Sequence, residues 1–181
     1  MQSKTPIRAL RAQAGFTLVE LMFVVVLVAT LTAIAIPSFR SMIVNNRLTT
    51  QANDFIGAIN FARSEAISHN TTATFCRAGS ETATTCAGSS GAWGFWIVRD
   101  SAGTVLRRGV INVYGGAIAL SSTLVNDSVA FSSDGMARTN GALITDRSFV
   151  VCADNISDNN IRTITIGAGS RMSTVKSSGG C

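Results

Sequence analysis

The sequence predicts an α+β protein in which a long N-terminal helix, its first half spanning a membrane, packs on a mainly antiparallel β-sheet domain. Three patterns predict this class: an almost wholly apolar run, then apolar residues at spacings of three and four, then short segments with a period of two. They divide the chain into a leader, a transmembrane half-helix, an amphipathic half-helix and a β-rich globular domain, at residues 1–15, 16–36, 37–70 and 71–181.

Composition sets the scale of the globular domain. The chain has 181 residues, 46% of them hydrophobic, and a mean hydropathy of +0.33, which the early apolar run raises. The roughly 110 residues after the helix are enough to bury a core of their own. The net charge of +5 depends strongly on the leader: without its three basic residues, 12 basic and 10 acidic residues remain, which weakens a nucleic-acid interpretation.

The apolar run from Phe16 to Ile36 would be roughly 30 Å long as a helix, which matches the hydrocarbon core of a bilayer. Three basic residues precede the run, so the N-terminus is expected in the cytoplasm and the C-terminal part across the membrane. A cleaved signal peptide is the alternative, since AIA at residues 33–35 resembles a cleavage site. The carboxylate of Glu20 inside the run argues against that alternative.

Glu20 needs a cationic partner, because an ionised carboxylate in an apolar setting must be paired or neutralised. Cleavage after Gly15 would create an amine on Phe16, with a reference pKa of about 7.7 to 8, about one helical turn from Glu20. The two groups can meet within one chain, and they can also pair between neighbouring helices. The second arrangement makes assembly the favoured state.

The segment GFTLVE at residues 15–20, followed by the rest of the apolar run and Pro37, resembles the prepilin motif of type IV pilins and type II secretion pseudopilins. The resemblance implies that a membrane-bound prepilin peptidase cuts after Gly15 and N-methylates Phe16. It also implies that Glu20 pairs with the terminal amine of a neighbouring subunit during assembly.

Pro37 directly follows the apolar run. Inside a helix it removes one backbone hydrogen bond and introduces a bend, so we expect a helix kink there. The helix is expected to continue, because apolar residues recur at spacings of mostly three and four, and to end near residues 68–72. The expected apolar face consists of Phe39, Ile43, Ala52, Phe55, Ile56, Ile59, Ala62, Ala66 and Ile67.

Beyond residue 72 the period changes to two, with glycine, serine and asparagine between short segments. No helical pattern intervenes, so we expect one mainly antiparallel sheet built from hairpins, with one face on the helix. The expected strands are residues 72–76, 93–100, 105–114, 128–133, 147–152 and 162–167.

This region resembles the GspH/FimT domain. The resemblance rests on FARSEAI at 61–67, WGFWIVRD at 93–100, VAFSSDGMA at 129–137, and FVVC at 149–152 followed by RTITIGAGSR at 162–171. It implies the type IV pilin fold and a place among minor pilins of the FimU and FimT kind and the minor pseudopilin H of type II secretion.

Four cysteines follow the apolar run, as expected of a domain in an oxidising compartment. Of the three possible connectivities we favour Cys76 with Cys86 and Cys152 with Cys181, each worth roughly 3 to 4 kcal/mol on the chain-entropy model. A zinc site is the alternative, but the spacings lack a C-x2-4-C pair and His69 is the only histidine.

Other candidate sites are weaker. The Asp- and Asn-rich residues 152–160 suit calcium, but they are more typical of a solvated loop. Trp93, Phe95 and Trp96 suggest a binding platform, although strand alternation places Phe95 opposite Trp96. No catalytic motif occurs, so we expect neither an enzyme nor a cofactor.

Nucleic acid is a further candidate partner, because some FimT-type pilins bind DNA through a basic stretch that resembles Gly-Arg-x-Arg. The corresponding residues 167–176 have serine before Arg171 and lack the second nearby arginine. Phosphate contacts would come from Arg162, Arg171 and Lys176. These charges suit a solvated face or a subunit contact better.

The resemblances together imply a minor pilin of the FimU/FimT type. Such a protein is inserted in the bacterial inner membrane with its domain in the periplasm, and then joins other minor pilins and the major pilin in a type IV pilus at the cell surface. There it would prime assembly near the tip and support twitching motility. The alternatives are the type II secretion minor pseudopilin H and a DNA-binding receptor pilin.

Overall fold

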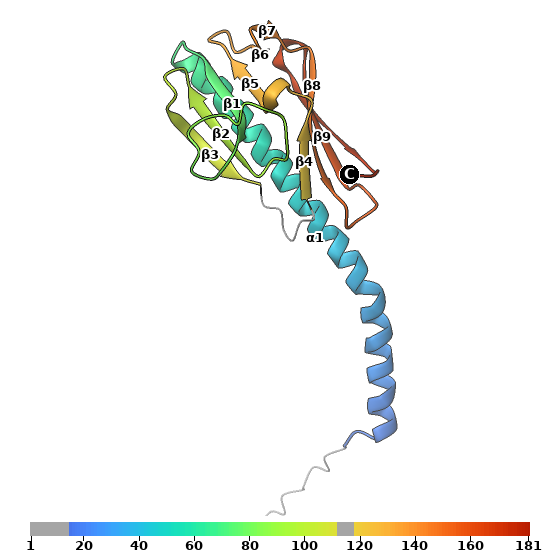
Figure 1. Ribbon diagram of the computed structural model, residues 1–181. Helices are drawn as coiled ribbons and strands as arrows, with labels where there is room; N and C mark the ends of the chain where they lie inside the picture. The colour runs from blue at the N-terminus through green and yellow to red at the C-terminus, as the bar shows by residue number, and fades with distance from the viewer. Residues whose placement is uncertain (1–14, 112–117) are drawn as a thin grey trace, which may run out of the picture. The chain divides into compact units, whose positions relative to one another are not determined.

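The computed structural model describes residues 15–111 and 118–181, so residues 1–14 of the expected leader lie outside the described part. The chain divides into two compact units, residues 1–40 and 41–181, and each is described by itself. Helix α1 (Leu18–Ser68) begins in the first unit and ends in the second (Figure 1).

Within the first unit, α1 starts where Thr17 caps it. The Thr17 Oγ1 accepts a hydrogen bond from the Glu20 backbone N–H at 3.2 Å, which satisfies one of the free donors at the helix start. The backbone is helical through Pro37, as the sequence predicts, while the kink expected there stays a prediction. The side chains that face outward from residues 18–36 are overwhelmingly apolar.

The second unit contains the strands. Their bounds are β1 (Ala73–Ala78), β2 (Phe95–Asp100), β3 (Val105–Val110), β4 (Ile118–Ser122), β5 (Ser128–Phe131), β6 (Ala137–Thr139), β7 (Ala142–Leu143), β8 (Asp146–Ala153), β9 (Ile161–Gly167) and β10 (Met172–Ser177). Two short 3-10 helices, η2 (Val125–Asp127) and η3 (Ala168–Ser170), lie between them. All strand pairs are antiparallel, which confirms the expected class.

The strands form two sheets, where the sequence analysis expects one. A six-stranded sheet has the order β3-β2-β1-β5-β6-β7, and a four-stranded sheet has the order β10-β9-β8-β4. In the second sheet β8 pairs with β4 and with β9, and β9 pairs with β10; no pairing among the described strands joins it to the first sheet. Strands β4, β6, β7 and β10 are absent from the expected set.

The core of the second unit lies between the C-terminal half of α1 and both sheets. Leu48, Ala52, Phe55, Ile59 and Ala62 on the helix are 0–2% exposed. Phe39 and Ile67, which the sequence analysis places on the same apolar face, are more than half exposed. The buried face of the helix therefore starts about three turns after Pro37.

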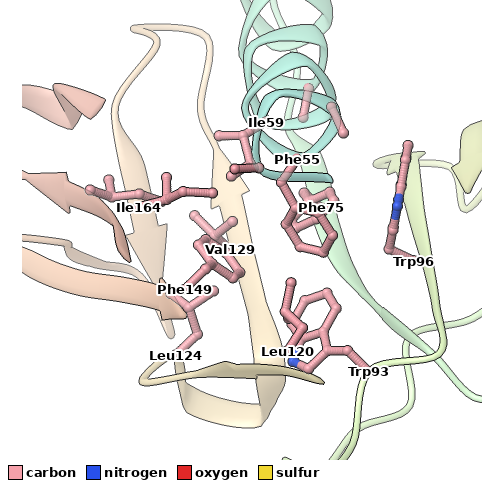
Figure 2. Packing of buried hydrophobic residues seen from close by; sticks show 14 of the residues in the cluster. Phe55, Ile59, Phe75, Trp93, Trp96, Leu120, Leu124, Val129, Phe149 and Ile164 are labelled. Carbon is pink, nitrogen blue, oxygen red and sulfur yellow. The ribbon is translucent and has the colours of Figure 1, made fainter. Parts of the chain in front are cut away.

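An aromatic cluster occupies the centre of this core (Figure 2). The Phe55 ring lies 5.4 Å from that of Phe75, 5.5 Å from that of Trp93 and 5.7 Å from that of Phe149, mostly in edge-to-face arrangements. Trp93 and Trp96 are 3% and 5% exposed, so they are core residues and do not form a binding platform.

Two disulfides tie peripheral segments to the sheets. Cys76 of β1 is bonded to Cys86, with Cα atoms 5.6 Å apart, and Cys152 of β8 is bonded to Cys181, with Cα atoms 5.9 Å apart. These are the pairs that the sequence analysis favours. The second bond anchors an exposed C-terminal tail.

Candidate functional site

The first candidate site is the exposed apolar part of α1. An 18-residue window within this helix has a mean hydropathy of 2.6 and is not buried at all, which makes it long and apolar enough to cross a membrane. The fully buried core residues of α1 start at Leu48, well after this segment. The segment therefore fits a transmembrane helix, and in water it would expose a large apolar surface.

Three residues of the expected prepilin motif lie at the start of this helix. Gly15 and Phe16 precede the first helical residue, and the Phe16 side chain is 83% exposed. Glu20 lies in the first turn, where the partial positive charge of the helix N-terminus favours a carboxylate. Among the described residues no cation is within ion-pair distance of Glu20.

Thr17 has a role in this turn that was not expected from the sequence. Threonine followed three residues later by glutamate is the signature of a capping box, and the threonine half of that arrangement is present. The hydrogen bond from the Glu20 N–H to Thr17 therefore explains why the helix starts at Leu18. A helix that starts there leaves Gly15 and Phe16 in an accessible segment before it.

The three basic residues considered for DNA contact differ in exposure, and Arg162 is the buried one. Only 3% of Arg162 is exposed, and its guanidinium is bonded to groups within the protein. Arg171 and Lys176 are both exposed, but Arg171 follows η3 and precedes β10, whereas Lys176 lies within β10.

Arg162 is instead a buried contact between β9 and α1. Its Nη1 donates to the Asn159 carbonyl at 2.6 Å and to the Ile161 carbonyl at 3.0 Å. Its Nη2 donates to Asn45 Oδ1 at 3.1 Å and to Thr49 Oγ1 at 3.4 Å. Burial lowers the pKa of Arg162 from its usual value, because the charged form loses solvation.

A second buried charge, which the sequence analysis missed, joins four segments of the domain. Asp127 is 1% exposed and accepts hydrogen bonds from Arg77 Nε at 3.0 Å, from the Gly91 N–H at 2.8 Å and from the Ser122 hydroxyl. Arg77 also donates to the Ser89 carbonyl. The network fixes the loop before β2 against β1, β4 and η2, so its role is structural.

The remaining candidates have ordinary structural surroundings. His69 lies at the end of α1, is largely exposed, and is 3.4 Å from Glu65 through its Nε2. In the described part of the chain no three His, Cys, Asp or Glu side chains gather where they could hold a metal ion. Both disulfides are formed, so all four cysteines are used in them.

Comparison with known proteins places these features in a family. Residues 51–170 match the family described as type II transport protein GspH, and residues 10–36 match the prokaryotic N-terminal methylation motif. A search of curated proteins finds no match.

Two crystal forms of the type IV minor pilin FimU of Pseudomonas aeruginosa are similar in structure. One is 19% identical, covers 72% of this chain and 89% of the FimU chain, and has a TM-score of 0.51. The other is 18% identical, covers 70% and 91%, and has a TM-score of 0.49. The first likeness supports the type IV pilin fold. Because the GspH match spans about two thirds of the sequence and the methylation motif covers the start of the apolar helix, the chain belongs to the GspH family of type IV minor pilins and pseudopilins.

Proposed function

We propose that this protein is a minor pilin that primes the assembly of a type IV pilus and becomes part of it near the tip. The observation that carries the proposal is the exposed apolar half of α1 with a single carboxylate in its first turn. Such a helix is suited first to lipid and then to the packed helices of a filament, since both offer an apolar environment.

Processing would prepare the helix for the filament. A prepilin peptidase would cut between Gly15 and Phe16, which precede the helix in an exposed segment, and would methylate the new amine of Phe16. Glu20 then supplies the negative charge that pairs with the amine of an adjacent pilin. Because an unpaired carboxylate is costly in an apolar setting, this pairing favours one axial register between neighbouring subunits.

The globular domain would supply the contacts with other minor pilins and the major pilin. Before assembly it would lie in the periplasm, where the two disulfides are stable. Because the matched family consists of pilins and pseudopilins, we assign the chain a structural rather than an enzymatic role.

A second candidate is a minor pseudopilin of a type II secretion system. It is favoured by the matched family, whose description refers to type II transport. The same helix and the same carboxylate would then operate in the periplasmic pseudopilus, so the two candidates differ in the filament that they build.

Deletion of the gene distinguishes the two candidates. We expect loss of surface pili and of twitching motility, with secretion of type II substrates unchanged, and we expect the full chain supplied in trans to restore both. The shed pili, sheared from the complemented strain, should contain the protein. Loss of secretion with normal pili would contradict the proposal and identify the pseudopilin.

A further inference from the structure

A polar surface pocket of about 270 Å³ lies between α1 and the hairpin of β9 and β10. All of its lining residues belong to the second unit: Asn45, Asn46, Thr49, Asn159, Arg162 and Lys176. The pocket contains two cations and no carboxylate, and its other lining groups are amides and a hydroxyl, which can donate hydrogen bonds.

The two cations lie directly opposite each other on neighbouring strands. Lys176 of β10 is the direct register partner of Arg162 of β9, and neighbouring residues at such positions have their Cβ atoms about 5 Å apart on the same face. Like charges in this position destabilise a sheet. Lys176 is exposed, so water solvates its charge. Arg162 is 3% exposed, so water solvates its charge much less.

Among the residues that the structure describes, no carboxylate lies within ion-pair distance of Arg162 or Lys176. The nearby Asp158 accepts hydrogen bonds from Asn159 and Ser178. In the described residues, the ion pairs formed are those of His69, Arg77 and Arg138, and neither Arg162 nor Lys176 is among them. Residues 1–14 and 112–117 contain neither aspartate nor glutamate. In addition, the buried Arg162 Nε has no hydrogen-bond partner. A buried cation that lacks a counter-charge is costly, and an anion from outside would remove that cost.

We propose that this pocket receives the carboxylate of an aspartate or glutamate side chain from a neighbouring pilin. The inference rests on the proposed function and names the chemistry of one subunit contact. The carboxylate would lie between the Lys176 ammonium and the Arg162 guanidinium, with hydrogen bonds available from the asparagine amides that line the pocket.

The pocket suits a single flexible side chain better than a nucleic-acid backbone. Arg162 lies below the surface, where a thin carboxylate-bearing side chain can approach and a duplex cannot. Arg171 precedes β10 and does not line this pocket, so the repeated phosphates of a duplex would find Lys176 as the one exposed cation of the lining.

Charge reversal at Lys176 tests the inference in the full-length protein expressed in its own cells. Lys176→Glu supplies a carboxylate from within the chain, so it should close the pocket to the partner while relieving the like-charge pair. We expect an unchanged or higher Tm and a loss of about tenfold in the amount recovered from sheared pili. Arg171→Glu makes the same change of charge outside the pocket, and it should leave recovery unchanged.

A photo-activatable cross-linker at the exposed Asn46 identifies what occupies the pocket. We expect an adduct on another pilin next to an aspartate or glutamate, and we expect replacement of that acid by lysine to restore recovery of Lys176→Glu. An adduct only on DNA or phospholipid, or on a segment without an acid, would overturn the inference. Equal recovery of Lys176→Glu and wild type would also overturn the inference, but it would leave the proposed function intact. Absence of the wild-type protein from pili would contradict both the inference and the proposed function.

Discussion

At the scale of single residues, some charged side chains have an oppositely charged partner within the chain and others do not. Asp127 is buried but has Arg77 and two further donors around it, so its charge is compensated inside the domain. Glu20 and Arg162 have no oppositely charged partner in the described residues. Asp127 therefore has a structural role, and we propose that Glu20 and Arg162 form contacts with neighbouring subunits.

Glu20→Ala should leave membrane insertion intact and strongly reduce incorporation into pili. Alanine is well tolerated in an apolar helix, so insertion does not depend on the carboxylate, but the variant cannot pair with a neighbouring amine. Membrane fractionation and immunoblots of sheared pili measure the two effects separately. Glu20→Gln, which keeps the size of the side chain, should behave in the same way. Thr17→Ala, which removes only the cap, should have the smaller effect; equal incorporation of wild type and Glu20→Ala would refute the pairing.

Asp127→Ala should lower the free energy of unfolding by about 3 kcal/mol, because it leaves the largely buried Arg77 without its counter-charge. Denaturant titration of the full chain in detergent measures this difference. Arg138→Gln is the matched control: it removes an ion pair with Asp134 at 2.8 Å that is partly open to solvent, and it should change stability far less. A similar small effect for both variants would show that the Asp127 network is not a stabilising element.

At the scale of elements, the long helix and its motif could be predicted from sequence because their signals are local. Hydropathy, spacing and the GFTLVE segment need no knowledge of the rest of the chain. Strands β7 and β10 gave no such signal: β7 has two exposed residues, and β10 is exposed along most of its length and carries serine, threonine and lysine. They are strands because neighbouring strands supply hydrogen bonds, which is a tertiary effect.

The burial of Asp127 and of Arg162 could not be predicted for a related reason. Arg77 and Asp127 are 50 residues apart in the sequence, and Arg162 and Asn45 are 117 apart, so no window of sequence brings either pair together. The residue types alone show only that these side chains are polar. Their burial follows from the way that the two sheets and α1 enclose them.

The C-terminal tail is held by a disulfide in addition to the hydrogen bonds that Ser178 and Gly179 form with residues 158–160. Residues 178–181 are exposed, and Cys181 is bonded to Cys152 across a sequence separation of 29. Cys181→Ser should lower the free energy of unfolding by about 3 kcal/mol, because the unfolded chain regains the entropy of that loop. Thermal unfolding under oxidising conditions measures the loss. The double variant Cys152→Ser with Cys181→Ser controls for a reactive leftover thiol, and an unchanged Tm in both would mean that the bond does not constrain the unfolded chain.

At the scale of the whole molecule, the two halves of the chain need different environments. Residues 41–181 bury an aromatic core of their own, whereas the apolar side chains of residues 18–36 are exposed. A protein with this division is stable only where lipid or other helices cover the first half. The account therefore depends on the apolar helix being kept after processing, since a chain without it has nothing to pack into a filament.

Mass spectrometry of the protein recovered from sheared pili tests that requirement most directly. We predict a mature chain that begins at Phe16, carries one added methyl group on its amine, and retains both disulfides. A mature chain that begins at Ile36 or later, or one found only as a soluble periplasmic domain, would contradict the account.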